Sequence, residues 1–371
     1  MRSMNKRLFK SGQKCHASLR DVARHVGLSV SVVSRALSRR PDKNARVAPD
    51  TVKKIAAAAR TLNFRRNRAA EFVKRGALPT LGVFVPAVSN RLIADLIFGI
   101  AEVARGEDFP LQIDSDLSLK GFRRFLRHNL DLAHSGVISY PGLMFNPEVA
   151  REVKKFQSAG GKVVLVNSTP EISGVPMVAM DERLGGRLAA ERLLARNCKS
   201  FALAGEFRER GPGFEGRLTE ATVIGQLYGG APSRRNCGNA RPQCGQATLT
   251  EALQETYSIA KFPEDESGLR ELVKFCKSCA KPVGIFAVND KLALTIIRSL
   301  RDAGLTVGRD ALVVGYDDLE LAAESDPPLT TIHQPFREEG RLAARKLINL
   351  IYGETEQSAL ISPRLVARES G

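Results

Sequence analysis

The sequence lacks the features that mark secreted, membrane-spanning and many catalytic proteins. It has no run of roughly eighteen apolar residues, so no membrane-spanning helix is expected. The N-terminal stretch MRSMNKRLFKSGQKC has no apolar signal core, which predicts a cytoplasmic protein. No G-x-G-x-x-G turn follows the first predicted strand, and no Walker loop or Ser/His/Asp set appears. We therefore expect neither an enzyme nor a cofactor.

Candidate metal ligands are also sparse. The six cysteines and five histidines are scattered along the chain. Cys276 and Cys279 form one C-x-x-C pair, while Cys237 and Cys244 lie in a segment rich in Gly, Pro and Arg. A zinc site needs a second pair at similar spacing, or histidines, and neither is evident. We expect reduced cysteines with no shared role, and no bound metal.

Acidic residues are scarce at the N-terminal end. Residues 1–80 contain 20 basic and 4 acidic side chains, and their net charge of +16 equals that of the whole chain. The other 291 residues hold 36 side chains of each sign. Phosphate neutralisation and counterion release supply most non-specific affinity for nucleic acids. A basic N-terminal module on a neutral body therefore indicates a polyanion binder.

The basic module contains two short helical patterns separated by a glycine. Ser18 is placed to cap a first helix, and Asp21 in its first turn suits the helix dipole. Gly27 ends this helix, and Ser29 offers a cap for a second one that reaches Leu37. This order is that of the helix-turn-helix of DNA-binding proteins, although many all-α domains contain similar helix pairs. The charge distribution favours DNA binding.

The segments around the helix pair complete this module. A third helix is predicted to begin at Pro49 and to carry its apolar stripe to Phe64. Residues 1–17 are interpreted as a basic arm, and residues 65–76 as a basic segment too short to hold as an isolated helix. Three helices are enough to close a small core.

From Thr80 onward, short apolar strands alternate with amphipathic helices. The predicted strands are Leu81–Val85, Pro110–Ile113, Ser135–Ser139, Val163–Val166, Met177–Ala179, Ser200–Ala204, Val283–Ala287 and Ala311–Gly315. The alternation predicts parallel sheets covered on both faces, and this many strands require more than one sheet. A chain of 371 residues is expected to form two or three domains.

The N-terminal module resembles the head-piece of the lac repressor family. The resemblance rests on the pattern D-V-A-x-x-x-G-x-S-x-x-x-V-S-R-x-L at residues 21–37 and continues through 47–64 into 67–74. It implies that Val30 meets a thymine methyl, Ser31 a base or phosphate, and Arg35 a guanine. The expected DNA-contacting residues are Ser18, Ser29, Val30, Ser31, Ser34, Arg35, Asn67, Phe72 and Val73.

Residues 67–78 are similar to the hinge helix of that family, which inserts a leucine into a minor-groove step. Val73, a shorter wedge next to Phe72, stands at the matching position. Arg66 replaces a usual proline, and Glu71 replaces a neutral or basic residue. These departures predict weaker kinking of DNA. The alternative is an ordinary basic linker between the two halves of the chain.

The rest of the chain resembles the effector domain of the same family, which has the fold of type I periplasmic binding proteins. The resemblance is carried by PVGIFAVNDKLAL (282–294), RDALVVGYDD (309–318), PPLTTIHQP (327–335) and PRLVARES (363–370). It implies an α/β domain at residues 79–371, with two Rossmann-like subdomains around a cleft and chain crossings near 180 and 330. The all-α helix-turn-helix domain is expected at 18–66 and the hinge helix or linker at 67–78.

Ligands of doubly wound sheets bind where the carboxyl ends of strands converge. Asn289, Asp290 and Asp317 each follow a strand, and the resemblance implies that Asn289 and Asp317 hydrogen-bond an effector. Asp290 is explained equally well as a helix cap or turn stabiliser. Arginines beside the cleft favour an anionic effector, for instance a sugar acid or sugar phosphate. The remaining expected effector contacts are Ser89, Arg91, Asn167, and Arg208 or Arg217.

These features predict a sequence-specific transcriptional regulator, a repressor, whose DNA affinity depends on a small molecule bound between two subdomains. Two half-sites of a pseudo-palindromic operator require a dimer. No leucine heptads follow Arg368, so a homodimer is expected. We expect a bacterial protein that acts in the cytoplasm on the nucleoid. The alternative, a solute-binding-type ligand sensor without specific operator binding, is disfavoured by the basic head-piece.

Overall fold

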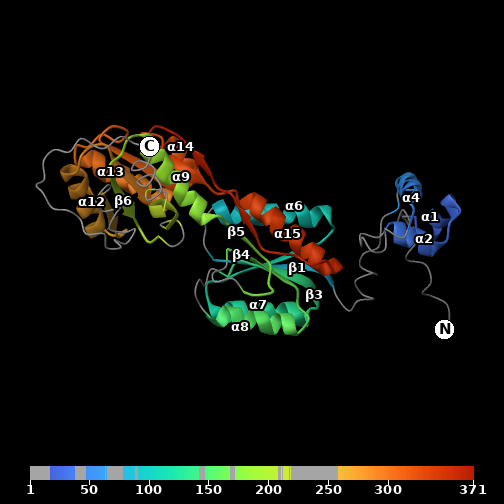
Figure 1. Cartoon of the computed structure of the whole chain (residues 1–371). Coiled ribbons are helices and arrows are strands. Elements are labelled where there is room, and N and C mark those ends of the chain that lie inside the picture. The colour runs from blue at the N-terminus through green and yellow to red at the C-terminus, as the bar shows by residue number, and fades with distance from the viewer. Residues whose placement is uncertain are drawn as a thin grey trace, which may run out of the picture.

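The structure is a computed structural model, and it describes residues 17–37, 47–62, 64, 78–87, 91–141, 147–167, 172–207, 210, 212–216, 218 and 258–371. Within these ranges, a small helical unit precedes two α/β subdomains (Figure 1). None of the helices in the described ranges is long and apolar enough to cross a membrane.

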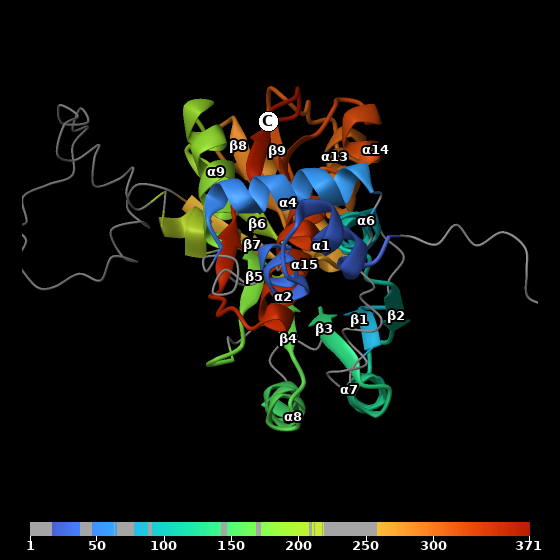
Figure 2. The same cartoon turned by 90° about the vertical axis from the view of Figure 1, so that its right-hand side faces the viewer.

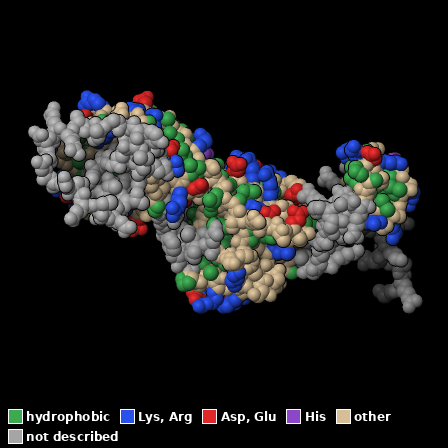
Figure 3. Space-filling view, in the orientation of Figure 1, with side chains coloured by type: hydrophobic (Ala, Val, Ile, Leu, Met, Phe, Trp, Pro, Cys, Tyr) green, Lys and Arg blue, Asp and Glu red, His purple; other side chains and the backbone are tan. Residues whose placement is uncertain are grey.

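The head-piece consists of α1 (Leu19–Val26), α2 (Val30–Ala36) and α4 (Pro49–Thr61). The three helices pack around an apolar core in which Val22, Val33 and Ile55 have no exposed surface. Each helix contributes one apolar stripe to this core, which is why periodicity alone predicted all three. Figure 1 shows the unit set apart from the rest of the chain, and Figure 3 shows Lys and Arg side chains on its outer surface.

The first subdomain is built on a six-stranded sheet with the strand order β11-β5-β4-β3-β1-β2. All of its strand pairs are parallel. The strands are β1 (Leu78–Val85), β2 (Leu111–Ser115), β3 (His134–Ser139), β4 (Val163–Val166), β5 (Met177–Met180) and β11 (Ala359–Ile361). One face is covered by α6 (Arg91–Gly106) and α15 (Phe336–Tyr352), and the other by α7 (Leu119–Asp131) and α8 (Pro147–Ser158), as Figure 1 shows.

Helices α6 and α15 approach each other closely enough for their backbones to touch. A Cβ atom on Gly340 would lie 2.1 Å from the carbonyl oxygen of Leu96, and one on Gly99 would lie 2.0 Å from that of Arg337. Any side chain at either glycine would therefore push the helices apart. This contact fixes α15 on the first subdomain, although the strand that precedes it in sequence, Thr330–His333, belongs to the second sheet.

The second subdomain is built on a sheet with the strand order β12-β10-β9-β8-β6-β7. Its strands are β6 (Ser200–Ala204), β7 (Ser258–Phe262), β8 (Val283–Ala287), β9 (Ala311–Asp317), β10 (Thr330–His333) and β12 (Arg364–Val366). Alternate residues of β6 and β9 belong to two separate apolar clusters, so both faces of the sheet are buried. α9 (Glu182–Ala195) covers one face, α12 (Glu266–Ser278) and α13 (Asp290–Asp302) cover the other, and the short α14 (Glu320–Glu324) follows β9.

The chain passes between the subdomains three times. It goes from β5 to α9, returns from β10 to α15, and crosses again between β11 and β12. The sequence predicted passages near 180 and 330 but not the third. It also predicted only parallel pairing, whereas β12 is antiparallel to β10. Figure 2 shows the two subdomains one above the other, with the second at the top.

Candidate functional site

Short polar side chains cap the first two helices of the head-piece. The Asp21 carboxylate accepts hydrogen bonds from Ser18 N (2.9 Å) and Ser18 Oγ (2.7 Å), while Ser18 Oγ accepts from Asp21 N. This capping box holds the pKa of Asp21 below its ordinary value. Gly27 ends α1 in the left-handed region, with a φ of 69°. Ser29 Oγ accepts from Val32 N and so begins α2 immediately afterwards.

Helix α2 turns its polar side away from the core of the head-piece. Its residues that are at least partly exposed include four predicted DNA contacts, namely Val30, Ser31, Ser34 and Arg35. Arg35 Nε donates to the Ser31 carbonyl oxygen at 3.2 Å, and Ser31 Oγ lies 2.9 Å from Ser29 Oγ. The arrangement presents Arg35 and Ser31 on one outward face, whereas Ser18 and Ser29 cap helices.

Several predicted residues cannot be placed. Those that lie outside the described residues are Asn67, Phe72, Val73, Ser89, Arg208 and Arg217. The basic arm at 1–16, nearly all of the hinge segment and the loop at 229–248 also lie outside them. The DNA and effector contacts assigned to these residues stay predictions.

Side chains from both subdomains gather where the strands end. Burial raises the pKa of Tyr140, which directly follows β3, to about 12. The negative charges of Glu339, Glu182 and Asp317 act on its hydroxyl in the same direction, and Arg210 acts against them. One ring therefore lies within electrostatic reach of groups from α15, α9 and β9. We call these five residues the cleft cluster.

Asp317, which ends β9, belongs to the cleft cluster, and its contact with an effector stays a prediction. Its Oδ1 accepts a hydrogen bond from Gln334 Nε2 at 2.6 Å. Burial raises its pKa to about 7, although Arg210 opposes this shift. Asn289, in contrast, caps α13, because its side-chain oxygen accepts a hydrogen bond from Leu292 N at 2.9 Å.

Asp290 has a structural role, and the prediction that it contacts an effector is corrected here. Its side chain has no exposed surface. One carboxylate oxygen accepts from Thr331 Oγ1 at 2.5 Å and the other from Leu319 N at 2.8 Å. Both oxygens thus hold β10 and the loop after β9 against α13, which is the turn-stabilising role that was the alternative for Asp290.

Arg210 is the arginine of the cleft cluster, and sequence reasoning missed it in favour of its neighbours. Its Nε pairs with the Glu182 carboxylate, its Nη2 donates to Glu182 Oε1 at 3.0 Å, and its Nη1 donates to the Val288 carbonyl oxygen at 2.7 Å. The guanidinium carbon lies 3.6 Å from the centre of the Tyr316 ring. Although burial opposes its charge, Glu182 holds the pKa of Arg210 above its ordinary value. The charge of Arg210 is therefore already compensated.

Arg91 is also paired. Its Nε lies 3.2 Å from Asp95 Oδ2 within α6, and its Nη1 lies 3.0 Å from Glu320 Oε1 on α14. Because α6 and α14 belong to different subdomains, the second ion pair bridges them. The structure thus places Arg91 at the boundary between the subdomains but gives its charge two acidic partners.

Asn167 connects the end of β4 to the first turn of α15. Its Oδ1 accepts from Met180 N at 3.0 Å, and its Nδ2 donates to Glu339 Oε2 at 3.1 Å. Sequence reasoning missed Glu339, which has no exposed surface. The signal was its spacing, since it falls on the same helical stripe as Phe336 and Ala343, both buried.

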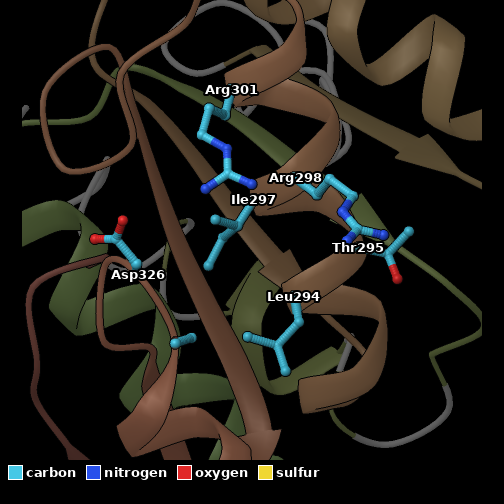
Figure 4. Close-up of a pocket in the computed structure, with 7 residues that line it drawn as sticks. Leu294, Thr295, Ile297, Arg298, Arg301 and Asp326 are labelled. Atoms are coloured by element: carbon cyan, nitrogen blue, oxygen red, sulfur yellow. The ribbon is translucent and has the colours of Figure 1, made fainter.

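A separate cavity of about 330 Å³ lies between α13 and the segment after α14 (Figure 4). It is lined by Leu294, Thr295, Ile297, Arg298, Arg301, Ser325 and Asp326. The predicted effector contacts that the structure describes do not line it. Across the described ranges, no group of three or more His, Cys, Asp or Glu side chains is arranged to hold a metal ion.

Two family descriptions match the chain. Residues 18–67 match bacterial regulatory proteins of the lacI family, and residues 190–371 match a periplasmic binding protein-like domain. The chain is 26% identical to the HTH-type transcriptional regulator RegA of Clostridium saccharobutylicum, over 95% of this chain and 98% of that protein. It is also 26% identical to the ribose operon repressor of Escherichia coli (strain K12), over 95% of this chain and 99% of that protein.

Solved structures agree with the fold. The lac repressor dimer bound to operator and the anti-inducer ONPF has a TM-score of 0.61 and 21% identity, covering 95% of this chain and 98% of that chain. The complex of the transcriptional regulator CelR with cellobiose has a TM-score of 0.60 and 22% identity, covering 96% and 100%. The predicted order of a helix-turn-helix unit followed by two α/β subdomains is confirmed. The chain therefore carries a lacI-family DNA-binding domain followed by a periplasmic binding protein-like domain, and it is similar over nearly its whole length to transcriptional regulators.

Proposed function

We propose that this chain represses transcription by binding a pseudo-palindromic operator as a homodimer, under the control of a small-molecule effector. The observation that supports the proposal is the outward face of α2, where Ser31 and Arg35 project from a head-piece region that carries the whole net charge of +16. A helix placed in this way fits the major groove, where arginine recognises guanine. The dimer supplies the second half-site.

The effector is proposed to bind at the cleft cluster. Tyr140, Asp317 and Glu339 come from both subdomains, so a molecule that contacts all three changes how far the subdomains close. The ion pair between Arg91 and Glu320 bridges the same boundary. A change in closure moves the start of the first subdomain, to which the head-piece is joined, and thereby couples the two sites. One relative is a ribose operon repressor, and one similar solved structure is a complex with cellobiose. Both favour a sugar as the effector class.

The proposal places the protein on chromosomal DNA in the cytoplasm and assigns it no catalytic step. The relatives that match over nearly the whole chain are transcriptional regulators. An N-terminal helix-turn-helix unit with a strong positive charge is not explained by a solute-binding sensor that does not recognise an operator.

The test is retention of genomic DNA fragments by the full chain at two salt concentrations, followed by sequencing. Arg35→Ala removes a proposed guanine contact, and Arg60→Ala removes an equal charge from the exposed surface of α4. We expect a shared palindrome that survives the higher salt with the parent chain and Arg60→Ala. Arg35→Ala should weaken its retention about tenfold or more, since a bidentate base contact contributes about 1–3 kcal/mol. Equal retention of unrelated fragments by all three proteins would contradict operator recognition.

A further inference from the structure

One carboxyl group stands in the apolar stripe by which α15 packs on the first subdomain. Glu339 has no exposed surface and lies one turn from Phe336 and Ala343, which are buried in the same stripe. The preceding residue, Glu338, is exposed. An apolar side chain at position 339 would satisfy the packing, so packing does not explain why a carboxyl group is buried there.

The hydrogen bonding of this carboxyl is incomplete. Asn167 Nδ2 donates to Oε2 at 3.1 Å, whereas Oε1 is buried and has no partner among the described residues. Asn167 is itself fixed, because its Oδ1 accepts from Met180 N. A buried acceptor without a donor is unfavourable, and natural proteins retain such groups where a ligand or a reaction uses them.

The unpartnered oxygen belongs to the edge where ligands of such sheets bind. Asn167 follows β4, and Tyr140 follows the neighbouring strand β3 and packs on the face of the sheet that α15 covers. Glu339 acts electrostatically on Tyr140, as does Asp317 from the facing subdomain. Glu339 and Tyr140 therefore lie together near the boundary with the second subdomain.

The charge balance of this boundary is acidic. The cleft cluster contains three carboxyl groups and one guanidinium, and Arg210 is already paired with Glu182. Arg91 is likewise paired with Asp95 and Glu320. Among the described residues, no Lys or Arg forms an ion pair with Asp317 or Glu339, while Arg208 and Arg217, the other arginines suggested for an anion site, lie outside those residues. Acceptor oxygens in excess of donors favour a ligand that brings donors.

We propose that Glu339 is a specificity-determining residue that accepts a hydrogen bond from a hydroxyl or ammonium group of the effector and excludes effectors with a carboxylate or phosphate. The inference rests on the proposed function only in taking the cleft cluster as the effector site. It narrows the effector class to neutral polyhydroxy compounds and amino sugars, and it excludes sugar acids and sugar phosphates.

The test is calorimetric titration of the full chain with three sets of sugars. Glucose, galactose and ribose are neutral, glucosamine and galactosamine carry an ammonium group, and gluconate and galacturonate carry a carboxylate. Glu339→Gln keeps the volume and still accepts from Asn167, but it presents an N–H in place of the free acceptor. Glu338→Gln makes the same change on the exposed side of the helix. We expect binding from the neutral or amino set, a loss of about tenfold or more in Glu339→Gln, and no change in Glu338→Gln.

Tighter binding of a sugar acid than of its neutral counterpart, or equal affinity in Glu339→Gln, would overturn the proposal. If none of these sugars binds, thermal melting without ligand decides. Glu339→Gln should then melt within about 2 °C of the parent chain, because a carboxyl reserved for a ligand does not hold the fold. A drop as large as that of Asp318→Asn, whose carboxylate is held by Arg368 and His333, would assign Glu339 a structural role instead. Failure of the proposed function would show separately, as loss of operator retention by the parent chain.

Discussion

The raised pKa of Asp317 predicts that Asp317→Asn changes how stability depends on pH. The ordinary value of 3.8 rises to about 7 in the folded chain, chiefly through burial. Because the folded pKa is above the unfolded one, the stability associated with this group is fully present below about pH 4 and is lost as pH rises through about 7. A shift of about three units corresponds to about 4 kcal/mol in all, of which about 2.5 kcal/mol falls between roughly pH 5 and pH 8.

Urea unfolding of the parent chain and of Asp317→Asn, at those two pH values, measures this difference directly. The variant should gain about 2.5 kcal/mol relative to the parent chain when the pH is raised from about 5 to about 8. Asp310→Asn is the control. Arg309 and the backbone N–H of Thr306 lower the pKa of Asp310 to about 2, so its loss should destabilise equally at both pH values. A pH-independent difference for Asp317→Asn would refute the reasoning.

Three further outcomes follow from the packing and the caps. Gly340→Ala should lower the free energy of unfolding by about 1–3 kcal/mol in urea titrations, because its Cβ would lie 2.1 Å from the Leu96 carbonyl oxygen; an unchanged value would mean that α6 and α15 separate easily. Ser18→Ala should lower the thermal stability of the head-piece by about 1 kcal/mol, measured by circular dichroism, with the α/β domain unaffected. Glu182→Ala should destabilise the chain by about 3–5 kcal/mol in chemical denaturation, since it strands the mostly buried Arg210; a loss below about 1 kcal/mol would show that water readily reaches this guanidinium.

Elements with a strong local signal were predictable from the sequence. The strands Val163–Val166, Ser200–Ala204 and Val283–Ala287 have the predicted bounds because each is a short apolar run buried on both faces. The first two helices of the head-piece were also predictable, because a capping serine marks the start of each and a glycine ends the first. In such segments, consecutive residues are enough to predict which side chains are buried.

The rest depends on contacts between distant parts of the chain. β11 and β12 have three residues each, too few to show a period, and they form only because partner strands are available. Glu339 is recognised as a site residue only through its hydrogen bond with Asn167, 172 positions earlier. Asp290 and Asp317 both follow or end a strand, so the sequence does not distinguish them. Only the positions of Thr331 and Leu319 show that both carboxylate oxygens of Asp290 accept hydrogen bonds within the protein.

The three passages between the subdomains have a consequence for synthesis on the ribosome. The sheet of the first subdomain is completed by β11, and α6 is covered by α15, so this subdomain cannot finish folding until residues 359–361 have emerged. Until then Leu96 and Ile100, both fully buried in the finished protein, lack their partner helix. A cut between β6 and β10 leaves neither half with a complete sheet. In chimaeras, the segment from β1 to β12 therefore has to be exchanged as a single unit.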